Sequence, residues 1–242
     1  MNKSRKNAEN KVNVQDKDER RKEMKDEKNG SGILEVVFIL DRSGSMSGLE
    51  QDTIGGFNST LARQKAEHDN IIWSTILFDD KVEVIHDRMP AGAVKELTEH
   101  DYYVRGTTAL LDAVGCAIDN TVANHRHTRK EYVPEKTLFV ITTDGMENAS
   151  REYTYEQIRR KIRHEQEKHG WEFIFLGANI DAVTEAGRIG IMPSRAASYV
   201  NDGIGIMKNY RAVSDAMGSM ARMEKMDEAA LEEVREDFRK RG

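Results

Sequence analysis

The chain has few cysteines and few prolines: its 242 residues include one Cys, Cys116, and three Pro. A single cysteine excludes an intramolecular disulfide, so we predict a reducing, cytoplasmic location. Cys116 lies in an apolar run at 113–118 that has the character of a helix face. We interpret it as a small buried side chain rather than a reactive thiol.

Long hydrophobic runs are also missing. No apolar run approaches the roughly 18 residues that a membrane helix needs, and the polar first 30 residues contain no apolar core of a signal peptide. Acidic residues number 42 against 37 basic ones, and the net charge of -5 gives no general attraction to nucleic acid or membrane phosphates. We therefore expect a soluble protein that binds neither.

Residues 1–31 form a segment of their own, with ten Lys or Arg and seven Asp or Glu but almost no large apolar side chain. Such a segment cannot offset the entropy lost on ordering, so we predict a disordered charged tail. A basic arm that contacts nucleic acid is the alternative, which the interleaved acids disfavour. Residues 32–224 suit one α/β domain, and a charged helix or tail is expected at 225–242.

The domain alternates apolar strands with amphipathic helices. Strands are predicted at 33–40, 71–78, 82–85, 137–142, 171–176 and 197–200, and helices at 49–67, 110–122, 155–168, 181–187 and 204–223. Most strands are apolar throughout, as in a parallel sheet covered on both faces. We predict a three-layer, doubly wound (Rossmann-like) α/β fold. Its mostly parallel six-stranded sheet has the order 3-2-1-4-5-6, with strand 3 antiparallel at the edge.

In such a sheet, ligands bind at the carboxyl ends of the strands, where the strand order reverses. The first strand is followed there by an Asp-x-Ser-x-Ser sequence formed by Asp41, Ser43 and Ser45. One carboxylate and two hydroxyl groups on a tight turn are hard oxygen ligands, which suit Mg²⁺ or Mn²⁺. Zinc would favour cysteine or histidine, and this loop has neither.

Two more loops point to the same edge. The fourth strand ends in Thr-Thr-Asp-Gly at 142–145, which places Asp144 there. The Arg-Gly-Thr-Thr-Ala-Leu sequence at 105–110 leads into a helix and offers a further hydroxyl group. Although the three loops are distant in sequence, the predicted topology brings them together at one switch point.

These loops resemble the metal-ion-dependent adhesion site of the von Willebrand factor A (integrin I-type) domain family. Residues 41–45 match its Asp-x-Ser-x-Ser element, Thr108 matches the Thr of its Gly-x-Thr loop, and Asp144 matches its final Asp. Thr107 is the alternative if the register differs by one. The resemblance spans residues 33–222, and the segment 175–181 is similar to stand-alone bacterial members.

The resemblance implies a site in which Asp41, Ser43, Ser45, Thr108 and Asp144 hold Mg²⁺ or Mn²⁺. The hydroxyl groups would bind the ion directly or nearly so, and the carboxylates directly or through water. The ion would then take an Asp or Glu of a protein partner as its last ligand. This implies a binding module and not an enzyme. By analogy, the helix at 204–223 is the one that partner binding can shift.

A hydrolase is the first alternative, because a turn rich in serine and glycine directly after a strand resembles a nucleophile loop. Ser47 or Asp41 would be its nucleophile. An oxyanion loop would need upstream strands, and the candidate histidines His164 and His169 lie in or at the end of a charged helix. An aspartyl nucleophile usually has a second acid two residues on, where Ser43 stands. The sequence is also compatible with a degenerate site that binds no metal and with a purely structural domain.

Several residues suggest structural roles. We interpret Asp79 and Asp80 as turn residues, and His125 as part of a helix end, where the carbonyl groups favour positive charge. Met207 and Met217 are interpreted as core residues that fill gaps.

Overall fold

The structure is a computed structural model that describes residues 31–178 and 180–242, so the tail predicted for 1–31 lies almost entirely outside the described residues. Its centre is a six-stranded sheet in the order β3-β2-β1-β4-β5-β6. The strands are β1 (Leu34–Asp41), β2 (Ile71–Phe78), β3 (Val82–Pro90), β4 (Lys136–Thr143), β5 (Glu172–Ala178) and β6 (Ala196–Tyr199). β3 is antiparallel to β2 and the other pairs are parallel, so the predicted topology is confirmed.

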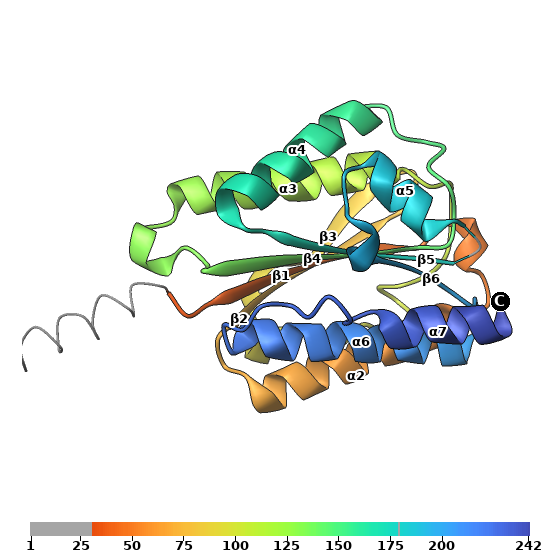
Figure 1. The fold of residues 1–242 in the computed structure, drawn as a ribbon, viewed down its shortest axis with the longest axis horizontal. Helices are drawn as coiled ribbons and strands as arrows, with labels where there is room; N and C mark the ends of the chain where they lie inside the picture. Colours follow the sequence, from red (N-terminus) through yellow and green to blue (C-terminus); the bar gives the residue numbers. More distant parts are fainter. Residues whose placement is uncertain (1–30, 179) are drawn as a thin grey trace, which may run out of the picture.

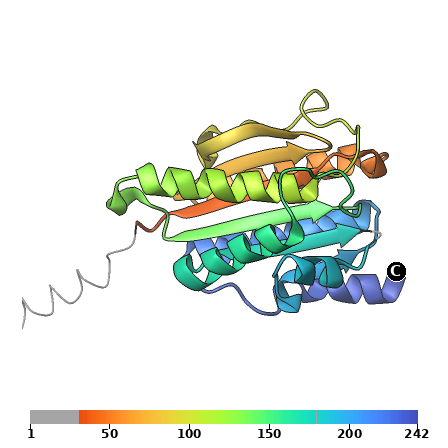
Figure 2. The same cartoon turned by 90° about the horizontal axis from the view of Figure 1, so that it is seen from above.

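Helices cover both faces of the sheet and give three layers (Figures 1 and 2). On one face lie α3 (Leu110–His127), α4 (Tyr155–His169) and α5 (Ala182–Arg188); on the other lie α2 (Glu50–Glu67), α6 (Gly203–Ala221) and α7 (Glu232–Arg241). Short 3-10 turns occur at Gly44–Met46 (η1), Ala91–Ala93 (η2), Lys130–Tyr132 (η3) and Pro193–Arg195 (η4). The predicted doubly wound α/β class is therefore confirmed.

The strands are buried because both faces of the sheet are covered by apolar side chains. Every residue of β1 is buried. On the α2 and α6 side Phe38 stacks on Trp73 with ring centroids 4.8 Å apart, and on the α3 and α4 side Phe139 stacks on Phe173 at 4.9 Å. Two separate cores thus fix β1 and β4 at the centre of the sheet, where their carboxyl ends lie side by side.

Helix ends follow the local sequence. Thr154 and Gln157 form a capping box at the start of α4, and Gly170 ends that helix in the left-handed conformation (φ 65°). Asp181 caps α5 by accepting a hydrogen bond from the Thr184 backbone. These caps place the loops that follow β4 and β5 at defined positions.

Some predicted side-chain environments differ from those observed. Met217 is buried as expected, but the prediction for Met207 was wrong, because 61% of it is exposed on the outer face of α6. Cys116 is only half-buried. His125 lies near the end of α3, where its Nε2 contacts the buried carboxylate of Glu35 at 2.5 Å. Hydrophobic periodicity identified the apolar face of each helix, but it did not show which turns of that face remain exposed to solvent.

Alanine substitutions at two adjacent glycines of α2, Gly55 and Gly56, are expected to change the stability of the fold in opposite directions. A Cβ atom at Gly56 would lie 2.1 Å from Cδ2 of Tyr210 on α6, whereas a Cβ at Gly55 would meet nothing within 4 Å. We expect Gly56→Ala to destabilise the fold by about 1 to 3 kcal/mol, because the ring must move. Gly55→Ala should stabilise it by about 0.5 to 1 kcal/mol, because alanine favours a helix. Urea unfolding measures both, and equal effects would contradict this close contact of α2 with α6.

The C-terminal helix α7 packs beside α6 and β6. Val234 is buried, and the guanidinium group of Arg235 donates to three carbonyl oxygens around the start of β6, those of Pro193 (3.2 Å), Ser194 (2.7 Å) and Ala196 (3.2 Å). The segment predicted as a charged helix or tail thus contains a docked helix, and the boundary at 225 stays a prediction. Within the described residues, no helix is long and apolar enough to cross a membrane.

Candidate metal site

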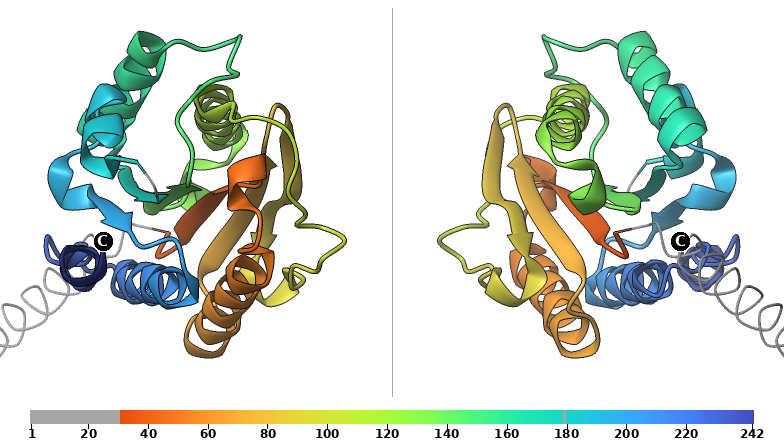
Figure 3. Two further views of the ribbon diagram at one scale, coloured as in Figure 1. Left: turned by 90° about the vertical axis from the view of Figure 1, so that its right-hand side faces the viewer. Right: turned by 90° about the vertical axis from the view of Figure 1, so that its left-hand side faces the viewer.

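Three loops meet at the carboxyl ends of β1 and β4. They are η1 with its flanking residues, the segment that leads into α3, and the turn after β4; the left view of Figure 3 faces this edge of the sheet. The backbone amide of Gly44 donates to the carbonyl oxygen of Gly106 at 3.3 Å, which joins the first loop to the second. The amide of Asn148 donates to the carbonyl oxygen of Thr108 at 3.0 Å, which joins the third loop to the second.

Asp41 is held rigidly at the end of β1. Its side chain is buried, Oδ1 accepts a hydrogen bond from the Ser43 backbone amide at 2.7 Å, and Oδ2 accepts one from Thr143 Oγ1 at 2.7 Å. The hydroxyl oxygens of Ser43 and Ser45 lie 3.1 Å apart. The Asp-x-Ser-x-Ser turn therefore directs one carboxylate and two hydroxyl groups to a common point.

Asp144 contacts the same group of oxygens. Its Oδ1 accepts a hydrogen bond from Ser45 Oγ at 2.5 Å, while its Oδ2 is buried and has no hydrogen-bond partner. Burial raises the pKa of Asp144 to about 6, and the nearby charge of Asp41 adds to this effect. A buried carboxylate oxygen without a partner, next to a second acid, is stabilised by a cation.

Thr108 reaches the site from the second loop. A Cβ atom built on Gly145 would lie 3.0 Å from Thr108 Oγ1 and 3.2 Å from Ser45 Oγ, so both hydroxyl groups border one small space. Thr108 is buried and Thr107 is exposed, which favours Thr108 as the residue at the site. The structure thus brings together all five residues predicted from the sequence, and their binding of a metal stays a prediction.

Gly145→Ala is expected to block this small space while leaving the sheet folded. The new methyl group would press on the hydroxyl groups of Thr108 and Ser45. We expect the free energy of ion binding to weaken by about 1.4 kcal/mol, which is a tenfold loss of affinity. Calorimetric titration with Mn²⁺ measures the change. Gly187→Ala on α5, where a Cβ meets nothing within 4 Å, is the control. Unchanged affinity in Gly145→Ala would mean that the ion does not bind beside Thr108.

The loop after β4 also supports Thr108, by contacts that sequence reasoning missed. Asn148 Oδ1 accepts a hydrogen bond from the Thr108 amide at 3.0 Å. Glu147 Oε2 accepts one from the Leu111 amide at 2.9 Å, which caps the start of α3, where the N-cap residue Ala109 has no capping side chain. The sequence signal was an acid and an amide just beyond the Asp-Gly turn.

The donor set matches a hard divalent cation. It consists of two carboxylates and three hydroxyl groups, all oxygen ligands of the kind that Mg²⁺ and Mn²⁺ prefer. Within residues 31–178 and 180–242, no group of three or more His, Cys, Asp or Glu side chains is placed to hold a metal ion. The candidate site has only two acids and depends on hydroxyl groups for its remaining ligands.

The histidines of the hydrolase alternative lie far from this edge. His169 is the last residue of α4 and its ring centroid lies 6.4 Å from that of Trp171, which precedes β5. His164 lies five residues earlier in α4, and its ring centroid is 6.3 Å from that of His169. Both are therefore near the amino end of the sheet, whereas Ser47 follows the carboxyl end of β1. This separation disfavours a Ser-His pair.

No protein-family model matches the sequence, and no curated protein sequence matches it significantly. Solved structures do resemble its fold. A von Willebrand factor type A structure from Catenulispora acidiphila is 16% identical, with a TM-score of 0.53 over 77% of this chain and 43% of that chain. Proximal thread matrix protein 1 of the mussel byssus, with zinc in its MIDAS motif, is 14% identical, with a TM-score of 0.53 over 78% and 47%.

The manganese-loaded TRAP protein of Plasmodium vivax is 15% identical, with a TM-score of 0.50 over 75% of this chain and 74% of that chain. This chain spans about half the length of the first two structures, 43% and 47%. At such low identity the likeness concerns the fold: the chain has the architecture of von Willebrand factor type A domains.

Proposed function

We propose that this chain binds Mg²⁺ or Mn²⁺ at the edge formed by β1 and β4, and through the ion binds an acidic side chain of a protein partner. The proposal rests above all on the convergence of two buried carboxylates and three hydroxyl groups, with Asp144 Oδ2 buried and unpaired. Such a cluster leaves buried negative charge without compensation, and a bound cation would compensate it.

The surroundings suggest a role for each side chain. Asp41 is fixed through both of its oxygens, so it would hold the ion or its water in one place. Ser43, Ser45 and Thr108 would contribute neutral oxygens, and Asp144 a charged one. Because few of the ligands are charged, the bound ion would keep enough positive charge to attract a carboxylate from outside.

Two further observations support this proposal. Structural neighbours hold zinc in a MIDAS motif in one case and manganese in another. Beside the site, Met146 is 60% exposed directly after Gly145, and Tyr103 is 44% exposed in the second loop. Exposed apolar side chains around a charged centre are typical of a surface that contacts another protein. We propose a binding role, not catalysis, and a cytoplasmic location.

The function is tested by metal-dependent retention of partners. Immobilised full-length chain would be exposed to cell extract in Mg²⁺, and bound proteins eluted with EDTA, with Asp41→Ala as the parallel column. For each partner identified, every exposed Asp and Glu would be changed to Asn or Gln in turn. Loss of binding on changing one acid supports the proposal. Partners retained equally by Asp41→Ala, or equally in EDTA, would contradict it.

A further inference from the structure

The residue between Asp41 and Ser43 is a buried arginine. Arg42 is 0% exposed, and its Nε donates to Asp79 Oδ2 at 2.9 Å while its Nη2 donates to Glu83 at 2.6 Å. Asp79 is itself 0% exposed and directly follows β2. A charged pair at this depth is costly to leave incomplete, so each partner fixes the position of the other.

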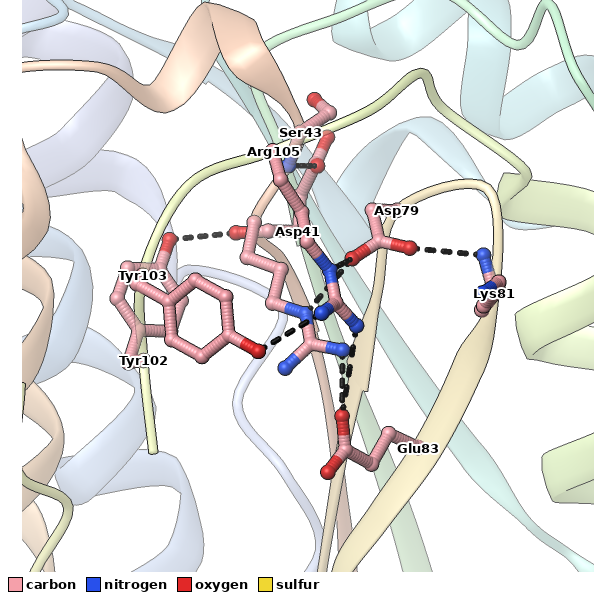
Figure 4. Close-up of polar contacts among 9 residues, drawn as sticks. Asp41, Ser43, Asp79, Lys81, Glu83, Tyr102, Tyr103 and Arg105 are labelled. Carbon is pink, nitrogen blue, oxygen red and sulfur yellow. Dashed lines mark hydrogen bonds and ion pairs between the residues drawn. The ribbon is translucent and has the colours of Figure 1, made fainter. Parts of the chain in front are cut away.

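The same carboxylate also holds the second loop of the candidate metal site. Arg105 Nε donates to Asp79 Oδ2 at 2.6 Å, so one oxygen joins two arginines from different loops (Figure 4). The backbone carbonyl of Asp79 accepts a hydrogen bond from the Ala109 amide at 2.8 Å. Asp79 thus holds the segment 105–109 near both of its ends, and Thr108 lies within that segment.

Further contacts close this network around the first loop. The Arg105 amide donates to the Arg42 carbonyl at 2.9 Å, and the ring of Tyr103 lies 5.5 Å and 5.1 Å from the two guanidinium carbons. Tyr102 donates its hydroxyl to the Asp41 carbonyl oxygen at 2.5 Å. Ion pairs, cation–π contacts and a backbone hydrogen bond therefore hold the loop that contains Thr108 against the end of the strand that contains Asp41.

We propose that Asp79 is a positioning residue of the metal site, which acts through Arg42 and Arg105 to hold Thr108 against Ser45 and Asp144. This inference rests on the proposed metal binding. Asp79 is not a ligand: its Oδ2 accepts from the two arginines, and its Oδ1 accepts from the Lys81 amide at 2.8 Å. Groups that orient the ligands of a metal typically contribute about 10- to 100-fold to its affinity.

The test is a titration of the full-length chain with Mn²⁺ alone, following the electron paramagnetic resonance signal of free Mn²⁺. Asp79→Asn is expected to weaken binding by about tenfold or more. Thr108→Val should also weaken it. If Asp79 acts through Thr108, the double variant should bind about as weakly as Thr108→Val alone, because the residue being positioned is already missing. Additive losses would overturn the inference.

Glu35→Gln is the matched control. Glu35 is also a buried β1 carboxylate, paired with Arg88 and His125, but it lies six residues before Asp41, about 20 Å away along the strand. It should lower stability and leave Mn²⁺ affinity unchanged. If Asp79→Asn does not fold, Arg105→Gln removes the contacts of a half-exposed side chain with Asp79, Glu83 and Tyr103, and it should weaken binding in the same way.

These variants distinguish a failure of the proposed metal binding from a failure of the positioning role of Asp79. If Asp41→Ala binds Mn²⁺ as well as wild type, the proposed function is wrong. If Asp41→Ala abolishes binding while Asp79→Asn and Arg105→Gln leave it unchanged, the metal site stands and the positioning role of Asp79 is wrong.

Discussion

Asp41→Ala is expected to abolish the rise in melting temperature that Mg²⁺ or Mn²⁺ gives to the wild-type chain. A ligand at about 100 times its dissociation constant stabilises the folded state by about 2.7 kcal/mol. In a domain of this size, that corresponds to a rise of about 5 to 10 °C. The variant loses the carboxylate that is fixed by Ser43 and Thr143, so its site can no longer hold the ion.

The measurement is a thermal melt of each protein in EDTA, Mg²⁺ and Mn²⁺, scored as the shift from its own metal-free melt. This scoring removes the destabilisation that Asp41→Ala causes by leaving the Ser43 amide unpaired. Ser47→Ala is the control, since Ser47 lies in the same turn and outside the predicted ligand set. It should keep the full shift. A wild type that gains no more from these ions than from NaCl would count against the metal site.

Asp144→Asn is expected to have two effects of opposite sign. Without metal the variant should be more stable than wild type at neutral pH, because the buried Asp144 carboxylate has an unpaired oxygen and a pKa raised to about 6. One pKa unit corresponds to about 1.4 kcal/mol, so we expect a gain of about 1 to 3 kcal/mol. With metal the order should reverse, since the amide cannot replace the charged ligand.

The pH dependence gives a second test of Asp144. Between the ordinary pKa of 3.8 and the raised value of about 6, the folded chain binds more protons at this residue than the unfolded chain. The cost of ionising Asp144 in the folded chain is thus absent at low pH and builds up as the pH rises from about 4 to about 6. The advantage of Asp144→Asn over wild type in EDTA should therefore grow between about pH 4 and pH 7.

Urea unfolding in EDTA across this range measures the difference. Asp87→Asn, which removes an exposed carboxylate from β3, is the matched control variant. A constant advantage for Asp144→Asn would mean that the carboxyl group ionises as freely in the folded chain as in the unfolded one.

The sheet was predictable because most strands are continuous apolar runs, and such runs need cover on both faces. The edge strand β3 was predicted only to residue 85 and extends to Pro90. Its second half, His-Asp-Arg-Met-Pro, has no apolar run, because an edge strand is solvated along one side. α3 likewise continues past the predicted residue 122 to His127, and the interpretation of His125 as part of a helix end is confirmed.

The five ligands could be proposed because each lies in a recognisable local sequence, either directly after a strand or, for Thr108, directly before α3. The contacts that support them depend on strand register, which no local sequence contains. Asp41 pairs with Phe78 across β1 and β2, and this register alone sets Arg42 beside Asp79. The interpretation of Asp79 as a turn residue was correct for its bond to Lys81 but missed the two arginines. With the sheet order known, the opposite charges of Arg42 and Asp79, each at the carboxyl end of one of two adjacent parallel strands, would have indicated this ion pair.

The docking of α7 determines how the sheet ends. β6 is an edge strand, and the free carbonyl groups of an edge offer a template for pairing with another chain. Arg235 donates to the carbonyl groups around the start of β6, so α7 blocks the pairing of another strand with this part of the edge. A shortened protein that stops at residue 224 would lose this protection of β6 together with the buried side chain of Val234. Self-association of such a fragment would then reflect its open edge and say nothing about natural oligomers.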